Sequence, residues 1–116
     1  MATSTTHALR APRSLAALND RFRRTGLGGQ IVITRGIAQL GNSAVAAIHA
    51  CVRSFDAFSP DNDPYGEHDF GAFDWAGRRL FWKISYYDPT LRFGSADPTD
   101  PALTCRVLTI MLAEEY

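Results

Sequence analysis

Net charge, cysteine and long apolar runs are absent or scarce in this chain of 116 residues. Its 12 Lys and Arg residues balance its 12 Asp and Glu residues, so the total charge gives no support for attraction to nucleic acid or an anionic membrane. No apolar run approaches the roughly 20 residues that a membrane-spanning helix needs. The sequence therefore argues against a nucleic-acid-binding or membrane-spanning protein.

The two cysteines, Cys51 and Cys105, do not stand in a Cys-x-x-Cys or Cys/His spacing that would hold zinc. Both are expected to be buried in helices of a cytoplasmic protein, where thiols stay reduced. The segment Met1–Pro12 lacks the apolar core of a signal peptide, and its composition predicts a flexible tail over residues 1–12. Residues 13–116 are long enough for a single domain with its own core.

Two helices and one strand are predicted in the first half of the chain. Ser14 is suited to cap a helix over residues 15–25, which Gly26 ends. β-branched residues predict a strand over residues 30–34. Apolar residues then recur at helical spacing, which predicts a second helix from Asn42 or Ser43 to about Phe55.

A β-hairpin is predicted over residues 69–87. A two-residue turn at Ala76-Gly77 would pair strand 69–75 with strand 78–87 and place Asp74 opposite Arg79. One face of the hairpin would then carry the large apolar side chains Phe73, Trp75, Leu80, Trp82, Ile84 and Tyr86.

The last segment is predicted to be a helix that runs nearly to Tyr116. Asp100 and Pro101 are typical of the first two positions of a helix, and apolar residues follow at intervals of three and four. The expected fold class is α+β, with about three antiparallel strands packed with three helices in the order α-β-α-β-β-α.

A polar segment in the middle of the chain carries the most information. It reads Asn62-Asp63-Pro64-Tyr65-Gly66-Glu67-His68-Asp69-Phe70-Gly71. With Asn19-Asp20-x-Phe22-Arg23 and with the later run from Arg106 to Ala113, it resembles an uncharacterised family of small alphaproteobacterial proteins that are often plasmid-borne. The resemblance runs from Asn19 to Tyr116 and implies a bacterial cytoplasm and, often, mobile DNA. It brings no known activity, cofactor or catalytic residue.

Acid–base or metal chemistry is one interpretation of this segment. Glu67, His68 and Asp69 would be the catalytic group of a metal-dependent hydrolase or a nuclease-like enzyme. Asp63, Glu67 and His68 would be ligands for Mg²⁺, Mn²⁺ or Ca²⁺. Strand alternation argues against both, because it sends His68 to the opposite face from its two acidic neighbours. No cofactor is therefore expected.

A structural role is the second interpretation. Asn62 and Asp63, which precede a proline, are typical of a turn held by their own side chains. Asp69 falls on the core-facing side of its strand, where a carboxylate needs a hydrogen-bond donor. Arg106, the Asn62 amide and backbone N–H groups of the last helix are the candidate donors. Asn62, Asp63, Asp69 and Arg106 would then form a polar network that fixes the loop.

A protein-binding surface is the third interpretation, and the sequence favours it. The candidate contact residues are Tyr65, His68, Phe70, Phe81, Tyr87 and Phe93, because several of these aromatic side chains lie off the predicted core face. Together with the mobile-DNA context, this predicts a small non-enzymatic protein that binds and inhibits bacterial defence machinery, such as a CRISPR effector or a restriction enzyme. A homodimer is also left open.

Overall fold

Four strands form one mixed sheet in the computed structural model, which describes residues 14–116. They are β1 (Gly29–Ile33), β2 (Phe70–Trp75), β3 (Arg78–Tyr87) and β4 (Cys105–Leu112), and their spatial order is β1-β4-β3-β2. β1 runs parallel to β4, and the other two neighbouring pairs are antiparallel. The predicted tail over residues 1–12 and the first residue of the predicted domain lie outside the described residues.

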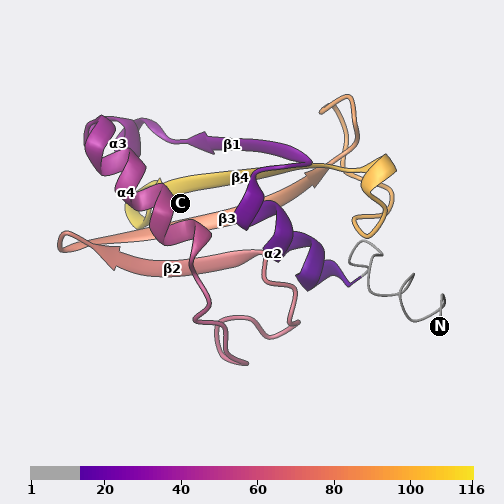
Figure 1. Cartoon of the computed structure of the whole chain (residues 1–116), viewed down its shortest axis with the longest axis horizontal. Helices are drawn as coiled ribbons and strands as arrows, with labels where there is room; N and C mark the ends of the chain where they lie inside the picture. The colour runs from indigo at the N-terminus through magenta and orange to yellow at the C-terminus, as the bar shows by residue number, and fades with distance from the viewer. Residues whose placement is uncertain (1–13) are drawn as a thin grey trace, which may run out of the picture.

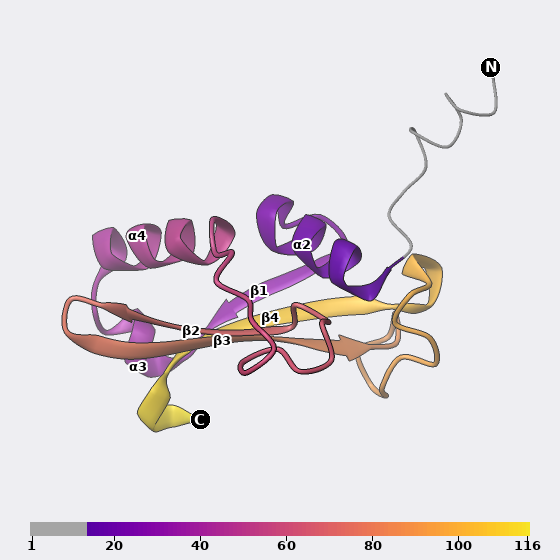
Figure 2. The same ribbon diagram turned by 90° about the horizontal axis from the view of Figure 1, so that it is seen from below.

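Among the described residues, three helices accompany the sheet: α2 (Leu15–Thr25), α3 (Arg35–Ala38) and α4 (Asn42–Arg53). Single 3₁₀ turns, η1 (Pro101–Leu103) and η2 (Ala113–Glu115), flank β4. Figures 1 and 2 show that α2 and α4 lie on the same side of the sheet. The fold class is α+β as predicted, with four strands where about three were expected. No described helix has the length and apolar character that crossing a membrane requires.

The ends of α2 follow the predicted signals. Ser14 Oγ accepts a hydrogen bond of 3.1 Å from the N–H of Ala17, and Gly26 adopts a left-handed φ of 74° directly after the helix. α4 buries Ile48 and Val52 as its apolar spacing predicts, although Gly41, rather than Asn42 or Ser43, is the capping residue.

The β2–β3 hairpin has the predicted register. Trp75 pairs with Arg78, and Gly71 pairs with Trp82. Ala76 and Gly77 have φ values of 50° and 78°, which match the left-handed conformation that a type I′ turn requires at both central positions. The predicted apolar face therefore points toward α2 and α4, and Trp82 is fully buried there.

The predicted C-terminal helix is wrong. Asp100 and Pro101 do start a helical turn, and the Asp100 side chain accepts the Ala102 N–H at 2.9 Å, but the turn ends at Leu103. The chain then forms β4, which lies between β1 and β3. The segment between the predicted strand and the helix from Asn42, for which no element was predicted, contains α3. The predicted order α-β-α-β-β-α is therefore replaced by α-β-α-α-β-β-β, which is α2-β1-α3-α4-β2-β3-β4.

The expectation of two buried helical cysteines is also wrong. Cys51 is exposed on α4, and Cys105 is partly exposed at the start of β4. The core is instead built from the helix-facing side chains of the sheet packed against α2, α3 and α4: Phe22, Ile37, Ile48, Val52, Phe55, Leu80, Trp82, Ile84, Leu108, Ile110 and Leu112.

Candidate functional site

The loop between α4 and β2 is held by side chains of its own turn residues. Asn62 Oδ1 accepts the Ser59 N–H at 2.9 Å, and the Asn62 amide donates to the Ala57 carbonyl at 3.0 Å. Asp63 Oδ1 accepts the N–H groups of Glu67 and His68 at 3.1 and 3.3 Å. These bonds fix the loop in the way that Asx turn chemistry favours.

His68 joins this loop to helix α2. Its Nδ1 lies 3.0 Å from both carboxylate oxygens of Asp20, and its Nε2 lies 3.6 Å from Asp63 Oδ2. Its ring stacks on Phe58 with centroids 3.9 Å apart and planes 2° from parallel. The backbone of His68 is left-handed, with φ of 55°, which turns the side chain toward the helices. The expectation that strand alternation places His68 on the open side of the sheet is therefore wrong.

Asn19 is the centre of a second, buried set of contacts. Its amide Nδ2 donates to the Tyr86 hydroxyl at 2.8 Å and to the Glu67 carbonyl at 2.9 Å, and its Oδ1 accepts Arg106 Nε at 2.8 Å. The side chain is fully buried, so every polar atom in it needs a partner. One residue of α2 thus connects the loop, β3 and β4.

Arg23, which like Asn19 belongs to α2, holds the C-terminal end of α4. It is fully buried, and it donates to the carbonyls of Val52 and Phe55 at 3.0 and 2.8 Å. Its third bond goes to Asp20 at 2.9 Å. Burial alone raises the pKa of the Asp20 carboxyl, but hydrogen bonds from Arg23 and His68 outweigh it and hold that pKa below its usual range.

Two acidic side chains of the motif sit in surroundings that favour their neutral form. Burial, reinforced by nearby carboxylates, raises the pKa of Glu67, and burial raises that of Asp69, with Asp63 adding to the shift. Burial also raises the pKa of Tyr86 to about 12. Arg106 does not bond to Asp69, because its guanidinium is held by Asn19 and the Pro98 carbonyl. The predicted network of Asn62, Asp63, Asp69 and Arg106 is therefore not formed: Asn62 and Asp63 hold the loop, Arg106 belongs to the contacts of Asn19, and neither Asn62 nor Arg106 donates to the Asp69 carboxylate.

Within residues 14–116, no three His, Cys, Asp or Glu side chains are grouped so that they would hold a metal ion. The candidate ligands Asp63, Glu67 and His68 are neighbours in the loop. Their contacts run to backbone N–H groups and to Asp20.

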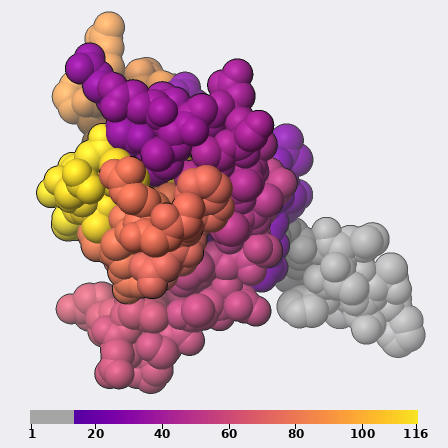
Figure 3. Space-filling view, turned by 90° about the vertical axis from the view of Figure 1, so that its left-hand side faces the viewer, coloured from indigo at the N-terminus to yellow at the C-terminus, as the bar shows by residue number. Residues whose placement is uncertain are grey.

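The side of the sheet opposite α2 and α4, called the open face below, carries an aromatic cluster. Phe70 and Phe81 are 5.2 Å apart between ring centroids, and Tyr116 packs on both at 6.2 and 5.6 Å. Lys83 Nζ lies 5.8 Å from the Tyr116 ring centre. Figure 3 shows the C-terminal segment directly beside the β2–β3 hairpin. Tyr116 remains 75% exposed, so the cluster is not closed to solvent.

The six predicted partner-contact residues fall in three places. Phe70 and Phe81 meet on the open face. Tyr87 and Phe93 lie at the far end of β3, where the Tyr87–Gly94 bridge closes a loop. Tyr65 projects from the α4–β2 loop and is 86% exposed, and His68 faces the helices from that loop. The first pair shares its surface with Tyr116, and Tyr65 and His68 line a shallow surface pocket together with Phe58.

Sequence reasoning missed several residues that organise these sites. Asp20, Phe58 and Tyr116 had no assigned role, and Asn19 and Arg23 entered only through the family resemblance. A signal was available at Asn19, which is polar yet adjacent to the apolar stripe of its helix. A buried amide in that position requires hydrogen-bond partners from other segments.

The fold and these contacts define a small α+β domain whose helices cover one face of a mixed sheet. The chain belongs to the family described as "Protein of unknown function (DUF3768)", whose model matches residues 33–115. Residues 19–32, which the resemblance had included, lie outside that match. No curated protein matches the chain, and neither does any solved structure.

Proposed function

We propose that this protein is a non-enzymatic protein-binding module that docks through the open face of its sheet. The aromatic cluster of Phe70, Phe81 and Tyr116 carries the proposal, because it lies on a face that none of the described α2 and α4 residues cover. Aromatic side chains bury large areas at little entropic cost, and they are enriched where proteins meet.

The backbone beneath this cluster is already ordered. β3 is paired on both sides, with Phe81 opposite Ala72 on β2 and Met111 on β4. Docking on it would order few further groups, which favours affinity. Lys83 forms no ion pair among the described residues and lies against Tyr116. The surface therefore suits a partner segment that offers an apolar side chain beside a carboxylate.

The proposed partner is a component of bacterial defence machinery, such as a CRISPR effector or a restriction enzyme, which the bound protein would inhibit. This finer proposal rests on the mobile-DNA context that the family resemblance implies. The hydrogen bonds of Asn19, Asp20, Arg23 and Asp63 support the non-enzymatic part of the proposal, since they leave these polar groups engaged within the domain.

The test uses bacteria whose CRISPR effector or restriction enzyme blocks a targeted plasmid. Expression of the protein is expected to restore transformation. The purified protein is expected to carry one defence component with it in a stoichiometric amount. Tyr116→Ala, which truncates an exposed ring, should reduce both effects, whereas Phe93→Ala, at an exposed ring elsewhere, should not. Equal activity of the Tyr116 and Phe93 variants would reject the open face as the docking surface. Failure to protect, while a partner outside defence is captured through Tyr116, would reject only the defence role.

The alternative is a metal-dependent hydrolase or nuclease-like enzyme that uses Glu67, His68 and Asp69. The contact between Asp20 and His68 Nδ1 favours it, because a carboxylate in this position orients an imidazole for proton transfer. Incubation with single- and double-stranded DNA and Mg²⁺ or Mn²⁺ tests it. Cleavage that is abolished by His68→Gln would support the enzyme, and intact substrate would count against it.

A further inference from the structure

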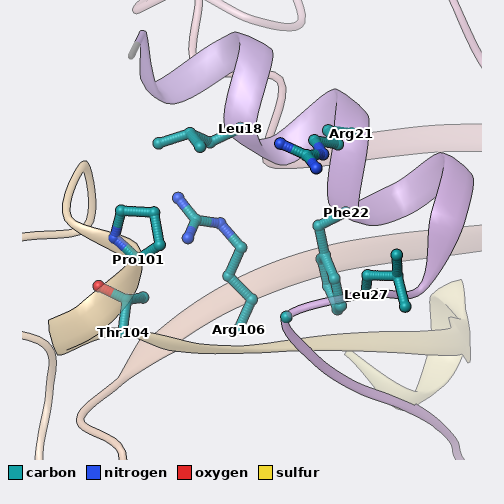
Figure 4. A pocket seen from close by; sticks show the side chains of 8 residues that line it. Leu18, Arg21, Phe22, Leu27, Pro101, Thr104 and Arg106 are labelled. Atoms are coloured by element: carbon teal, nitrogen blue, oxygen red, sulfur yellow. The ribbon is translucent and has the colours of Figure 1, made fainter. Parts of the chain in front are cut away.

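A cavity of about 280 Å³ lies between helix α2, the start of β1 and the turn that precedes β4. Figure 4 shows Arg106 rising from β4 into this space, with Arg21 on the opposite wall. Four apolar side chains form much of the remaining surface: Leu18, Phe22, Leu27 and Pro101. Its volume lies just below the range that is usual for ligand-binding pockets in proteins, about 300–1,000 Å³, and so suits a small ligand.

Arg106 brings a buried positive charge to this cavity without a carboxylate beside it. The residue is 4% exposed, and its hydrogen bonds go to neutral oxygens, from Nε to Asn19 Oδ1 at 2.8 Å and from Nη2 to the Pro98 carbonyl at 2.6 Å. Within residues 14–116, Nη1 has no hydrogen-bond partner, and no acidic side chain forms a salt bridge with this guanidinium.

The rest of the guanidinium is held in place. One of its faces lies against the Tyr86 ring, 5.4 Å from the ring centre, and the bonds to Asn19 and Pro98 fix its orientation. Burying a charged group costs free energy unless an opposite charge compensates for it. In agreement, burial lowers the pKa of Arg106. An anion bound at Nη1, the free edge of the Arg106 guanidinium at the cavity, would therefore supply the opposite charge that this buried group lacks.

We propose that this cavity binds a small organic carboxylate that carries an apolar group. The carboxylate pairs with the free edge of Arg106, and Arg21 closes over it from the surface of α2. The apolar group packs among Leu18, Phe22 and Pro101, with Leu27, which is 71% exposed, at the rim. A planar carboxylate matches the geometry of a guanidinium and offers one negative charge.

The same surroundings disfavour inorganic phosphate. A phosphate ion has two charges near neutral pH and no apolar part, so it leaves the walls formed by Leu18 and Phe22 without a partner and brings more charge into an apolar cavity. The cavity also lies on the helix side of the sheet. The proposed carboxylate site is therefore separate from the open face and does not rest on the proposed docking function.

The test is a titration of the ¹⁵N-labelled full chain with sodium benzoate, followed by backbone amide shifts. Saturable shifts are expected for residues 18–28 and 101–106. Benzamide should bind at least about tenfold more weakly, because it loses one charge-assisted contact. Inorganic phosphate should also bind at least about tenfold more weakly, because it leaves the apolar walls without a partner and brings a second charge into the cavity. Arg21→Gln should weaken benzoate binding about tenfold. Arg24→Gln, an exposed change on the same helix outside the cavity, should change it less than about twofold.

Any one of the following results would overturn the proposal: no saturable shift with benzoate, equal affinity for benzamide, or equal effects of the Arg21 and Arg24 variants. Because Arg21 is exposed, the Arg21→Gln variant keeps the buried contacts of the fold, and a loss of benzoate binding in it cannot be ascribed to unfolding. Tighter binding of phosphate than of benzoate would likewise reject a carboxylate with an apolar group.

Discussion

Arg106 Nε donates a hydrogen bond of 2.8 Å to Oδ1 of Asn19, and so joins the last strand to a helix 87 positions earlier in the chain. The same amide contacts Tyr86 and the backbone of Glu67. Because the Asn19 side chain is fully buried, its removal would leave its partners without a hydrogen bond that water does not readily replace.

Replacement of Asn19 by alanine is therefore expected to lower the free energy of unfolding by about 2–4 kcal/mol, since buried donors and acceptors are left unpaired. Urea denaturation followed by tryptophan fluorescence measures it. Asn42→Ala is the matched control, because Asn42 is exposed and makes no side-chain cap bond. A loss below about 1 kcal/mol would mean that the contacts at Asn19 contribute no more than an ordinary surface pair.

Trp82→Ala should lower the free energy of unfolding by about 3–5 kcal/mol, because Trp82 is fully buried between β3 and the helices. Phe93→Ala removes a ring that is 69% exposed and should change stability by less than about 0.5 kcal/mol. Thermal unfolding of both variants compares them directly. Equal melting temperatures would place Trp82 outside the core.

Gly71 is required where the hairpin meets the indole ring. A Cβ atom at Gly71 would lie 2.2 Å from Trp82 Nε1, so Gly71→Ala must displace that ring and is expected to cost about 1–3 kcal/mol. At Gly94 the nearest atom to an added Cβ is 4.0 Å away, and Gly94→Ala should be close to neutral. Denaturation midpoints that are the same for the two variants would contradict this difference.

Asp69→Asn should change stability in a pH-dependent way. Burial raises the pKa of Asp69 above its unfolded value. Its contribution to stability is therefore complete below the unfolded pKa, about 3.9, and is lost as pH rises through the higher folded pKa. The stability of the variant relative to the native chain should consequently increase from about pH 3 to pH 7.

Glu115→Gln provides a control of opposite sign for that experiment. The hydrogen bond from Thr34, together with the N–H groups of Leu112 and Gly36, lowers the pKa of Glu115. Its stabilising effect is present above the unfolded pKa and disappears as pH falls through the folded pKa. Urea titrations at several pH values measure both variants. Parallel pH dependences would contradict the assigned directions.

The hairpin was predictable from sequence because its signals are local. Ala76-Gly77 sets the turn, and alternation then assigns Trp82 to the core and Phe81 to the opposite face. α2 was predictable for the same reason, since Ser14 and Gly26 define its ends within the helix itself.

β4 was not predictable in this way. It lies between β1 and β3, and its sequence places apolar residues on both faces, with Leu108 and Ile110 on the helix side and Val107 and Met111 on the other. Burial alternates along most of the strand, but apolar character does not, so the run resembles a helix in its apolar content. Pairing with strands that are distant in the sequence distinguishes the two: β4 is antiparallel to β3 and parallel to β1, which lies more than 70 residues away.

The partners of the polar motif were also beyond local reasoning. His68 contacts Asp20, which lies 48 positions earlier, and its left-handed backbone breaks the alternation on which the prediction relied. Arg106 was assigned to a helix and thereby to the wrong neighbours. The composition of the loop indicated turns correctly, because Asn62 and Asp63 act within a few residues of themselves.

The strand order β1-β4-β3-β2 has a consequence for how the chain matures on the ribosome. β1 emerges early, yet it pairs with residues 106–110 of β4, so it cannot join the sheet until those residues have left the exit tunnel. Until then Leu108 and Ile110 are missing from the core that the helices share with the sheet. Folding is therefore expected to be completed in a late step that pairs β1 with β4, and the earlier nascent chain is expected to expose apolar surface of the kind that chaperones bind.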